Sequence, residues 1–230
     1  MSDSKISLWT PAGRALIFTL AASSIWCLLA EFYGLCSMRT FTFFVSIPAL
    51  AILTGLAIFD RVRGDRKTWN AILVGTIAGL AAAVAYDIFR IPFVYAKELH
   101  IDGIIPPLAL YKVFPRFGAM ILGQSVEQPS YSLSAQVVGW TYHFSNGLTF
   151  GIMYLAMVGD TSRRHWVWAV LMAVGLELGM LFTPYPQMFA IKVGAAFVIV
   201  TLVAHMIFGV ALGLGSRRLA KSWDNVKVSI

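Results

Sequence analysis

The sequence predicts an all-α membrane protein, a polytopic bundle of six transmembrane helices. Of its 230 residues, 58% are hydrophobic and only 13% are charged, whereas soluble domains have about 45–50% apolar and about 25% charged residues. Long apolar stretches also recur along the whole chain. So few charges and only two cysteines exclude a disordered chain and a disulfide-stapled secreted module. A chain of this length forms one compact unit.

Six segments are long enough to cross a bilayer. The apolar core of a membrane is about 30 Å thick and requires about 20 mostly apolar residues at 1.5 Å each. The first segment lacks a cleavage site and is too long for a signal peptide. In chain order the segments are 14–36, with Glu31 inside it; 41–59, without charge; 68–92, with Asp87 and Arg90 in its last turns; a stretch between 127 and 160; 165–183; and 188–214.

The basic residues predict the topology. Six spans place both termini on one side, and most of the 18 Lys and Arg residues fall on that side, in 5–14, 61–67, 163–164 and 217–227. We therefore expect a bacterial inner-membrane protein, N-in and C-in, with the lipid bilayer as its main partner. The same rule explains the net charge of +7, so no nucleic-acid partner is expected.

Glycine spacing predicts how the last four helices pack. Each carries a Gly-x3-Gly motif, which lets two membrane helices approach closely. His143 also precedes Gly147 by four residues, as His205 precedes Gly209. We therefore expect an N-terminal two-helix segment (1–66), a tightly packed bundle (67–218) with a 2+2 parallel repeat and an outer loop (97–132), and a cytoplasmic tail (219–230). The motif glycines are Gly75, Gly79, Gly147, Gly151, Gly175, Gly179, Gly209 and Gly213.

The same region resembles a known family. The run from Tyr142-His143-Phe144-Ser145 through Gly151 to Tyr154 is followed by a short basic loop, a helix ending at Pro184 and a final helix with His205 that closes on Arg217 and Arg218. This pattern is similar to the YagU-like family of bacterial inner-membrane proteins over roughly residues 70–218. The resemblance implies a membrane location and a helical fold. It implies no mechanism, because the family has no established activity, and the two additional N-terminal helices depart from the family's four-helix pattern.

Ionisable residues inside the spans are the candidate functional groups, because each costs about 2.5–3.5 kcal/mol to insert and usually faces the protein interior. Asp87 and Arg90 stand at i and i+3, which predicts an ion pair at the outer end of their helix. Alternatively, Arg90 and Lys192 line an outward vestibule for an anionic ligand. Glu177, buried without a cation, would be neutral and donate a hydrogen bond to His143 or Asn146, either as a static contact or for proton handling.

Two histidines on different helices also raise the hypothesis of haem b held by His143 and His205. Their predicted depths differ by about 7 Å of helix rise, which disfavours shared ligation. No His-x3-His or Cys-x2-Cys spacing predicts a metal site. The expected cofactor is therefore none.

The functional prediction is a non-enzymatic membrane protein for small-solute or proton translocation or stress adaptation, with a homodimer as one expected assembly. No Walker, nucleophile-elbow, zincin or dinucleotide motif is present, so no catalytic residue is predicted. Two alternatives remain: a haem-binding redox subunit, or a structural accessory subunit that docks a larger complex through glycine faces and Glu31. The apolar stretch 104–111 is too short to span and is expected to be re-entrant or interfacial, where it could cover a cavity.

Overall fold

The computed structural model describes residues 6–228, with side chains as far as Lys221. In this part of the chain the regular secondary structure is helical, apart from one isolated bridge between Ile6 and Gly64. Lys5 and the side chain of Lys227, two of the basic residues behind the topology prediction, lie outside the described part. The helices are α1 (Pro11–Ala21), α2 (Ser23–Phe32), α3 (Met38–Phe41), α4 (Ile47–Arg63), α5 (Lys67–Val94), α6 (Val113–Leu122), α7 (Leu133–Val158), α8 (Val167–Leu181), α9 (Tyr185–Met188) and α10 (Ala195–Val228), with a π-helical turn (Thr42–Ser46) between α3 and α4.

Several helices have the length and apolar composition of membrane spans. In the described residues these are the continuous stretch Met38–Arg63, α5, and α10 as far as Lys221. The pair α1 and α2, bent by 48°, makes a fourth if it crosses as one broken span. The chain is therefore a helical membrane protein. Helix α7 has 26 residues but a more polar middle, and α8 has only 15.

The first predicted span is broken at Ala22, and side chains of other helices bind carbonyl groups just after the bend. The Tyr142 hydroxyl of α7 donates to the carbonyl of Ser24 at 2.6 Å, and the Ser46 hydroxyl donates to that of Ser23 at 3.4 Å. These contacts tie the start of α2 to the neighbouring helices.

The last predicted span is shifted along the chain. Helix α10 begins at Ala195, after Gly194, and continues to Val228. Residues 219–228 are thus helical, whereas the sequence predicted that the membrane helix ends at 214 and a tail follows. The segment after Gly215 contains neither Gly nor Pro, so nothing in it terminates the helix.

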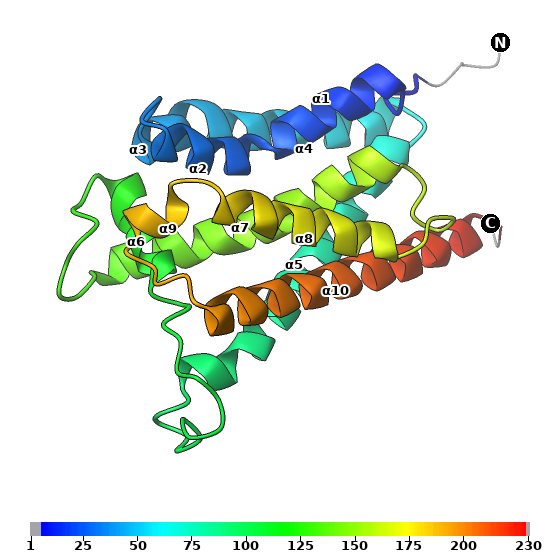
Figure 1. Ribbon diagram of the computed structural model, residues 1–230. Coiled ribbons are helices and arrows are strands. Elements are labelled where there is room, and N and C mark those ends of the chain that lie inside the picture. Colours follow the sequence, from blue (N-terminus) through cyan, green and yellow to red (C-terminus); the bar gives the residue numbers. More distant parts are fainter. Residues whose placement is uncertain (1–5, 229–230) are drawn as a thin grey trace, which may run out of the picture.

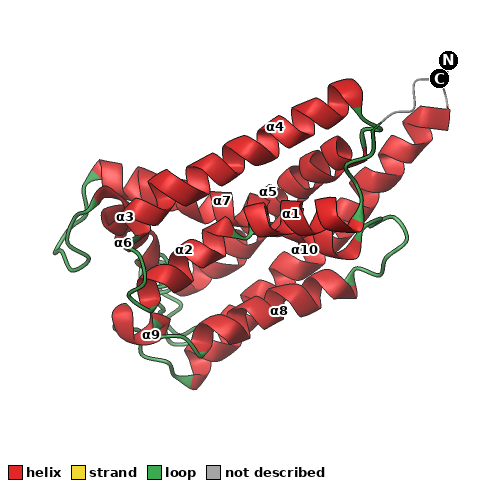
Figure 2. Ribbon diagram, turned by 90° about the horizontal axis from the view of Figure 1, so that it is seen from above, coloured by secondary structure: helices red, strands yellow, loops and turns green. Residues whose placement is uncertain are grey.

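The helices run back and forth along one axis (Figure 1). The start of α1, the α4–α5 and α7–α8 turns and the end of α10 lie together, which we call the termini end. The opposite end, which we call the loop end, holds α3, α6, α9 and the segment 95–112 (Figures 1 and 2). Helices α1 and α4 pack against α7 and α5 respectively, so the N-terminal helices cover one side of the bundle.

Glycines form the closest contact between α5 and α7. A Cβ atom added to Gly79 would overlap the carbonyl oxygen of Gly147, and one added to Gly151 would overlap that of Gly75. In α10, Gly209 faces the backbone of Val170 in α8, and Gly213 faces that of Trp166, the residue that precedes α8. These six motif glycines lie where the sequence places close helix contacts.

The two motif glycines of α8 behave differently, and their predicted packing role is wrong. A Cβ atom on Gly175 or Gly179 would meet no described atom within 4 Å. The buried residues of α8 are Ala169, Ala173 and Glu177, spaced four residues apart along one face. Because residues two apart point about 200° from each other, the glycines lie on the opposite face.

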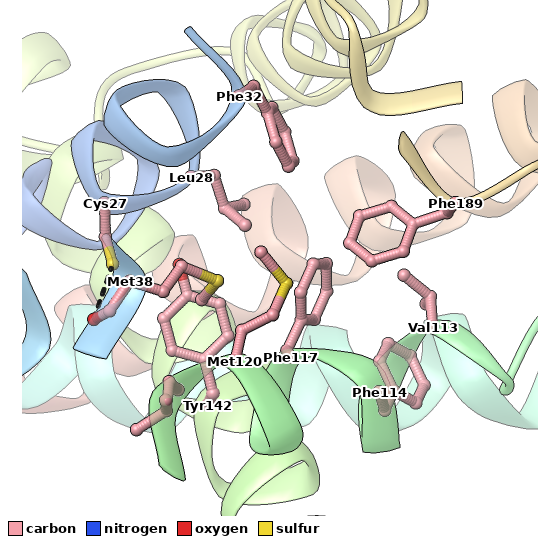
Figure 3. Packing of buried hydrophobic residues seen from close by; sticks show 11 residues of the cluster. Cys27, Leu28, Phe32, Met38, Val113, Phe114, Phe117, Met120, Tyr142 and Phe189 are labelled. Atoms are coloured by element: carbon pink, nitrogen blue, oxygen red, sulfur yellow. Dashed lines mark hydrogen bonds between the residues drawn. The ribbon is translucent and has the colours of Figure 1, made fainter. Parts of the chain in front are cut away.

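Helix α6 was missed within the predicted outer loop. It packs on α7 so closely that a Cβ on Gly118 would overlap the carbonyl oxygen of Ala135, and one on Gly139 would overlap that of Phe114. Around this contact, side chains of α2, α6, α7 and α9 form a buried apolar cluster, in which Phe117 lies edge-on to Phe189 with ring centroids 5.4 Å apart (Figure 3). The predicted interfacial stretch 104–111 consists of turns and irregular backbone.

Glu31, assigned by the sequence to packing or docking, has a local structural role. Its carboxylate accepts a hydrogen bond from the backbone N–H of Met38 at the start of α3. An acceptor at that position satisfies one of the free N–H groups of a helix start.

Candidate functional site

A buried cavity of about 140 Å³ lies between α2, α5, α6, α7, α8 and α10. Its walls are mainly apolar, with Leu28 and Phe117 among them. Ionisable and polar side chains reach it from five helices, and charged groups are seldom enclosed in this way without a partner. These polar lining residues are Tyr86, Arg90, His143, Asn146, Glu177, Tyr185 and His205.

The first polar group at this cavity is the Asp87–Arg90–His143 cluster. Asp87 is only 9% exposed, and its two carboxylate oxygens have different partners. Oδ2 lies 2.8 Å from Nε2 of His143, and Oδ1 lies 3.4 Å from a terminal guanidinium nitrogen of Arg90. The ring of His143 stacks on Phe114, with centroids 4.1 Å apart. The carboxylate therefore bridges a fixed cation and a titratable imidazole.

Arg90 is 3% exposed and is held by more than its ion pair. Its second terminal nitrogen donates to the carbonyl of Leu110 at 2.7 Å, and the rings of Tyr86 and Tyr111 lie 4.6 and 5.2 Å from its guanidinium carbon. Such cation–π contacts strengthen when water is excluded. Its Nε–H group has no hydrogen-bond partner among the described residues.

Tyr111, in the loop that precedes α6, closes the cluster from the loop end. Its hydroxyl donates to the backbone carbonyl of Asp87 at 2.6 Å. Burial raises the pKa of Tyr111 to about 12, and the nearby Asp87 carboxylate acts in the same direction. The phenol therefore stays protonated and keeps its donor role at physiological pH.

The second polar group is the pair Glu177–His205, which lines the same cavity as His143. Nδ1 of His205 lies 2.9 Å from the carbonyl oxygen of Thr201 and 3.5 Å from a carboxylate oxygen of Glu177. Because a backbone carbonyl only accepts, the shorter contact favours the tautomer with the proton on Nδ1. The side chains of Glu177 and His205 are 10% and 20% exposed.

Tyr86 links the two pairs. Its ring centroid lies 6.0 Å from that of His143 and 5.0 Å from that of His205. The sequence reasoning overlooked Tyr86, although it adjoins Asp87 and stands one helical turn before Arg90. A phenol beside two ionisable residues in an otherwise apolar span was the available signal.

The structure changes some predicted pairings. Glu177 pairs with His205, whereas the sequence suggested His143 or Asn146, and His143 pairs with Asp87. The Asp87–Arg90 ion pair exists, but it is buried under Tyr111 and Leu110, not placed at an exposed helix end. Asn146 lines the cavity, and its side-chain oxygen has no partner among the described residues.

A second cavity of about 370 Å³, which we call the vestibule, extends from this site to the loop end. It shares Tyr86, Arg90 and Glu177 with the buried cavity. Its rim includes Lys112 and Lys192, both exposed, so the predicted grouping of Arg90 with Lys192 corresponds to one continuous space.

The geometry of the two histidines disfavours shared ligation of haem. The ring of Tyr86 contacts both imidazoles, and the buried cavity of about 140 Å³ is well below the roughly 300 Å³ at which cofactor pockets begin. In the described part of the chain, no three His, Cys, Asp or Glu side chains gather in a way that could hold a metal ion.

Comparison with models of known protein families, with curated proteins and with solved structures finds no match. The resemblance to the YagU-like family therefore stays a prediction from the motifs alone.

Proposed function

We propose that this chain is a six-span inner-membrane protein that translocates a small solute together with protons. The observation that carries the proposal is the pair of carboxylate–imidazole contacts at one cavity, Asp87–His143 and Glu177–His205. Each contact brings a carboxylate within reach of an imidazole, a side chain that can hold a proton on either ring nitrogen. Membrane-embedded chains of Asp, Glu and His are typical of proton relays.

Six crossings are supported by the course of the chain. The first and last described residues both lie at the termini end (Figure 1), as an even number of crossings requires. Helix α7 is long enough to span, and its polar residues include those that face the cavity. Helix α8 is about 22 Å long by its rise and is completed at the loop end by α9. The basic residues of the turns at the termini end favour the N-in and C-in orientation.

The 2+2 repeat is supported by equivalent contacts in the pairs α5–α7 and α8–α10. Gly147 and Gly151 approach Gly79 and Gly75, four residues apart on α5. Gly209 and Gly213 approach Val170 of α8 and Trp166, the residue that precedes α8, which are also four residues apart. In each pair, the histidine four residues before the first of these glycines reaches a carboxylate on the partner helix. A duplicated unit around a shared central site is characteristic of transporters.

The polar site also suggests how proton binding is coupled to the solute. A proton on Asp87 would neutralise the carboxylate and release Arg90 from its ion pair, while a proton on His143 or His205 would add a charge beside the cavity. Both events change the electrostatic environment of a bound solute. The titratable and charged groups that face the site are Tyr86, Asp87 and Arg90 from α5, Tyr111 from the preceding loop of α6, His143 from α7, Glu177 from α8, Tyr185 from α9 and His205 from α10.

Proton flux in proteoliposomes tests the proposal. The full chain is reconstituted with a pH-sensitive dye inside, and a potassium gradient with valinomycin drives protons inward. We expect flux above that of empty liposomes, reduced about tenfold or more by Glu177→Gln or His143→Gln, since general acid–base groups typically contribute at least about 100-fold to proton transfer. Glu98→Gln and His165→Gln are matched controls, because both residues are exposed and lie away from the cavity.

Two results would count against translocation. The first is wild-type flux that equals the leak of empty liposomes under all tested driving forces and in the presence of carboxylate solutes. The second is flux that responds equally to Glu177→Gln and to Glu98→Gln. Thermal unfolding of each variant in detergent distinguishes lost transport from lost folding.

A further inference from the structure

The charges around the vestibule and the apolar walls of the buried cavity together point to a class of solute. We infer that the chain binds a small, singly charged carboxylate with a short apolar tail, which enters through the vestibule and is recognised by Arg90. This inference rests on the proposed function, because it names the solute of the same site.

The vestibule carries an excess of positive charge. Lys112 and Lys192 are exposed at its rim, and Arg116 and Arg90 lie deeper. Glu177 is the one acidic residue among the described residues that line it. A recess lined by one sign of charge concentrates ions of the opposite sign and accelerates their entry. The vestibule is therefore suited to anions.

The rim lysines differ from the deeper Arg116 in their contacts within the protein. Arg116 is engaged within the protein, since it donates to the carbonyl of Phe189 at 2.6 Å and to the hydroxyl of Tyr131 at 3.3 Å. No ion pair involving Lys112 or Lys192 is found in the part of the chain that the structure describes. These two lysines are thus available to attract an anion, and neither supports the fold through a salt bridge.

Arg90 has the geometry to receive a carboxylate where the two cavities meet. Its contact with Asp87 is 3.4 Å long, whereas charge-assisted N–H···O bonds are typically about 2.7–2.9 Å. The other oxygen of Asp87 is held by His143 at 2.8 Å, and the Arg90 Nε–H has no partner among the described residues. The guanidinium therefore retains the capacity to bind the carboxylate of a solute while its ion pair with Asp87 stays in place.

The buried cavity restricts the rest of the solute. Its volume of about 140 Å³ admits only a few heavy atoms, and its walls include Leu28, Phe117 and Phe208. Arg90 is the one Arg or Lys among the described residues that line it, so a second negative charge on the solute would be desolvated there without a second fixed cation. This disfavours phosphate, sulfate and dicarboxylates, and favours a monocarboxylate whose apolar tail lies against these side chains.

Calorimetric titration of the purified full chain in detergent, at constant ionic strength, tests the inference with three probes. Butyrate should bind, its neutral isostere butyramide should bind at least about tenfold more weakly, and inorganic phosphate should also be weaker. Lys112→Gln and Lys192→Gln should each weaken butyrate binding about two- to fivefold, as expected for exposed charges. Lys97→Gln is the matched control, because Lys97 is an exposed lysine of the same loop that lines neither cavity.

Arg90→Gln should abolish the difference between butyrate and butyramide, provided that its unfolding profile shows a folded protein. The lysine variants keep the test decisive if it does not fold. Equal affinity for butyrate and butyramide, tighter binding of phosphate, or equal effects of Lys97→Gln and Lys192→Gln would each overturn the inference.

Binding and flux separate this inference from the proposed function. Butyrate binding without proton flux would leave an anion-binding membrane protein and refute translocation. Proton flux that neither requires nor responds to butyrate, in a protein that does not bind it, would refute the carboxylate solute and leave proton translocation in place.

Discussion

Alanine in place of Gly79 and of Gly175 should have opposite effects on stability, although both glycines belong to Gly-x3-Gly motifs. The Cβ atom of Gly79→Ala would overlap the carbonyl oxygen of Gly147, which belongs to the rigid backbone of α7. The Cβ atom of Gly175→Ala would meet no described atom within 4 Å. The two substitutions are chemically identical and differ only in what surrounds the new methyl group.

The expected magnitudes follow from two opposing contributions. Alanine is preferred to glycine in a helix interior by roughly 0.5–1 kcal/mol. Overpacking a close contact costs about 1–3 kcal/mol, and here backbone has to move. Gly79→Ala should therefore lower the free energy of unfolding by up to about 2 kcal/mol, whereas Gly175→Ala should raise it by about 0.5–1 kcal/mol. Gly151→Ala, whose Cβ would overlap the carbonyl oxygen of Gly75, should follow Gly79→Ala.

Unfolding in mixed micelles, titrated with dodecyl sulfate and followed by the fluorescence of the seven tryptophans, measures both changes under one set of conditions. Equal destabilisation by Gly79→Ala and Gly175→Ala would refute the reasoning, because it would mean that the α8 glycines also lie in a close helix contact. A stabilising Gly79→Ala would show that α5 and α7 do not approach as closely as the contact at Gly147 requires.

Three further predictions concern other parts of the molecule. Arg14→Gln should lower the free energy of unfolding by about 1.5–3 kcal/mol, because Arg14 donates to the carbonyls of Ala156 and Met157 at the end of α7, at 2.8 and 2.7 Å. Arg163→Gln is the control: Arg163 forms only a surface ion pair, and its loss should change the free energy of unfolding by under about 1 kcal/mol. Tyr111→Phe should remove part of the pH dependence of the unfolding free energy, because the pKa of Tyr111 is raised from 10.0 to about 12 in the folded chain. The stabilisation that Tyr111 contributes is complete below pH 10 and is lost between about pH 10 and 12. An alkaline unfolding profile that is the same in the variant and the wild type would contradict this. Oxidised and dithionite-reduced spectra of the purified protein should show no Soret band, while a band abolished by His143→Ala or His205→Ala would establish the haem alternative.

Which parts of the fold could be predicted depended on how local the signal is. Helix content and membrane character could be predicted, because they depend on composition and on runs of apolar residues within each segment and not on contacts with distant parts of the chain. The ends of the helices were less predictable. The start of α2, just after the bend at Ala22, is bound by Tyr142 and Ser46, which are distant in sequence, and α6 is stabilised by its close contact with α7.

The candidate site shows the same division. By itself, the sequence identified Arg90, His143, Glu177 and His205, which line the cavity, since an ionisable residue within an apolar span is costly and therefore conspicuous. It also placed Asp87 and Arg90 together, because their separation of three residues is read within one helix. It could not assign His143 to Asp87 or His205 to Glu177. Those pairings join different helices, and they depend on how each helix is rotated and tilted.

Helix rotation also decided the role of the glycines. Four motifs of identical spacing have the same local propensity, yet only six of their eight glycines face a neighbouring helix closely. In α8 the face with Ala169, Ala173 and Glu177 is buried instead. Spacing along one helix shows which residues share a face, but only tertiary packing determines which face is turned inward, because that choice minimises the energy of all helices together.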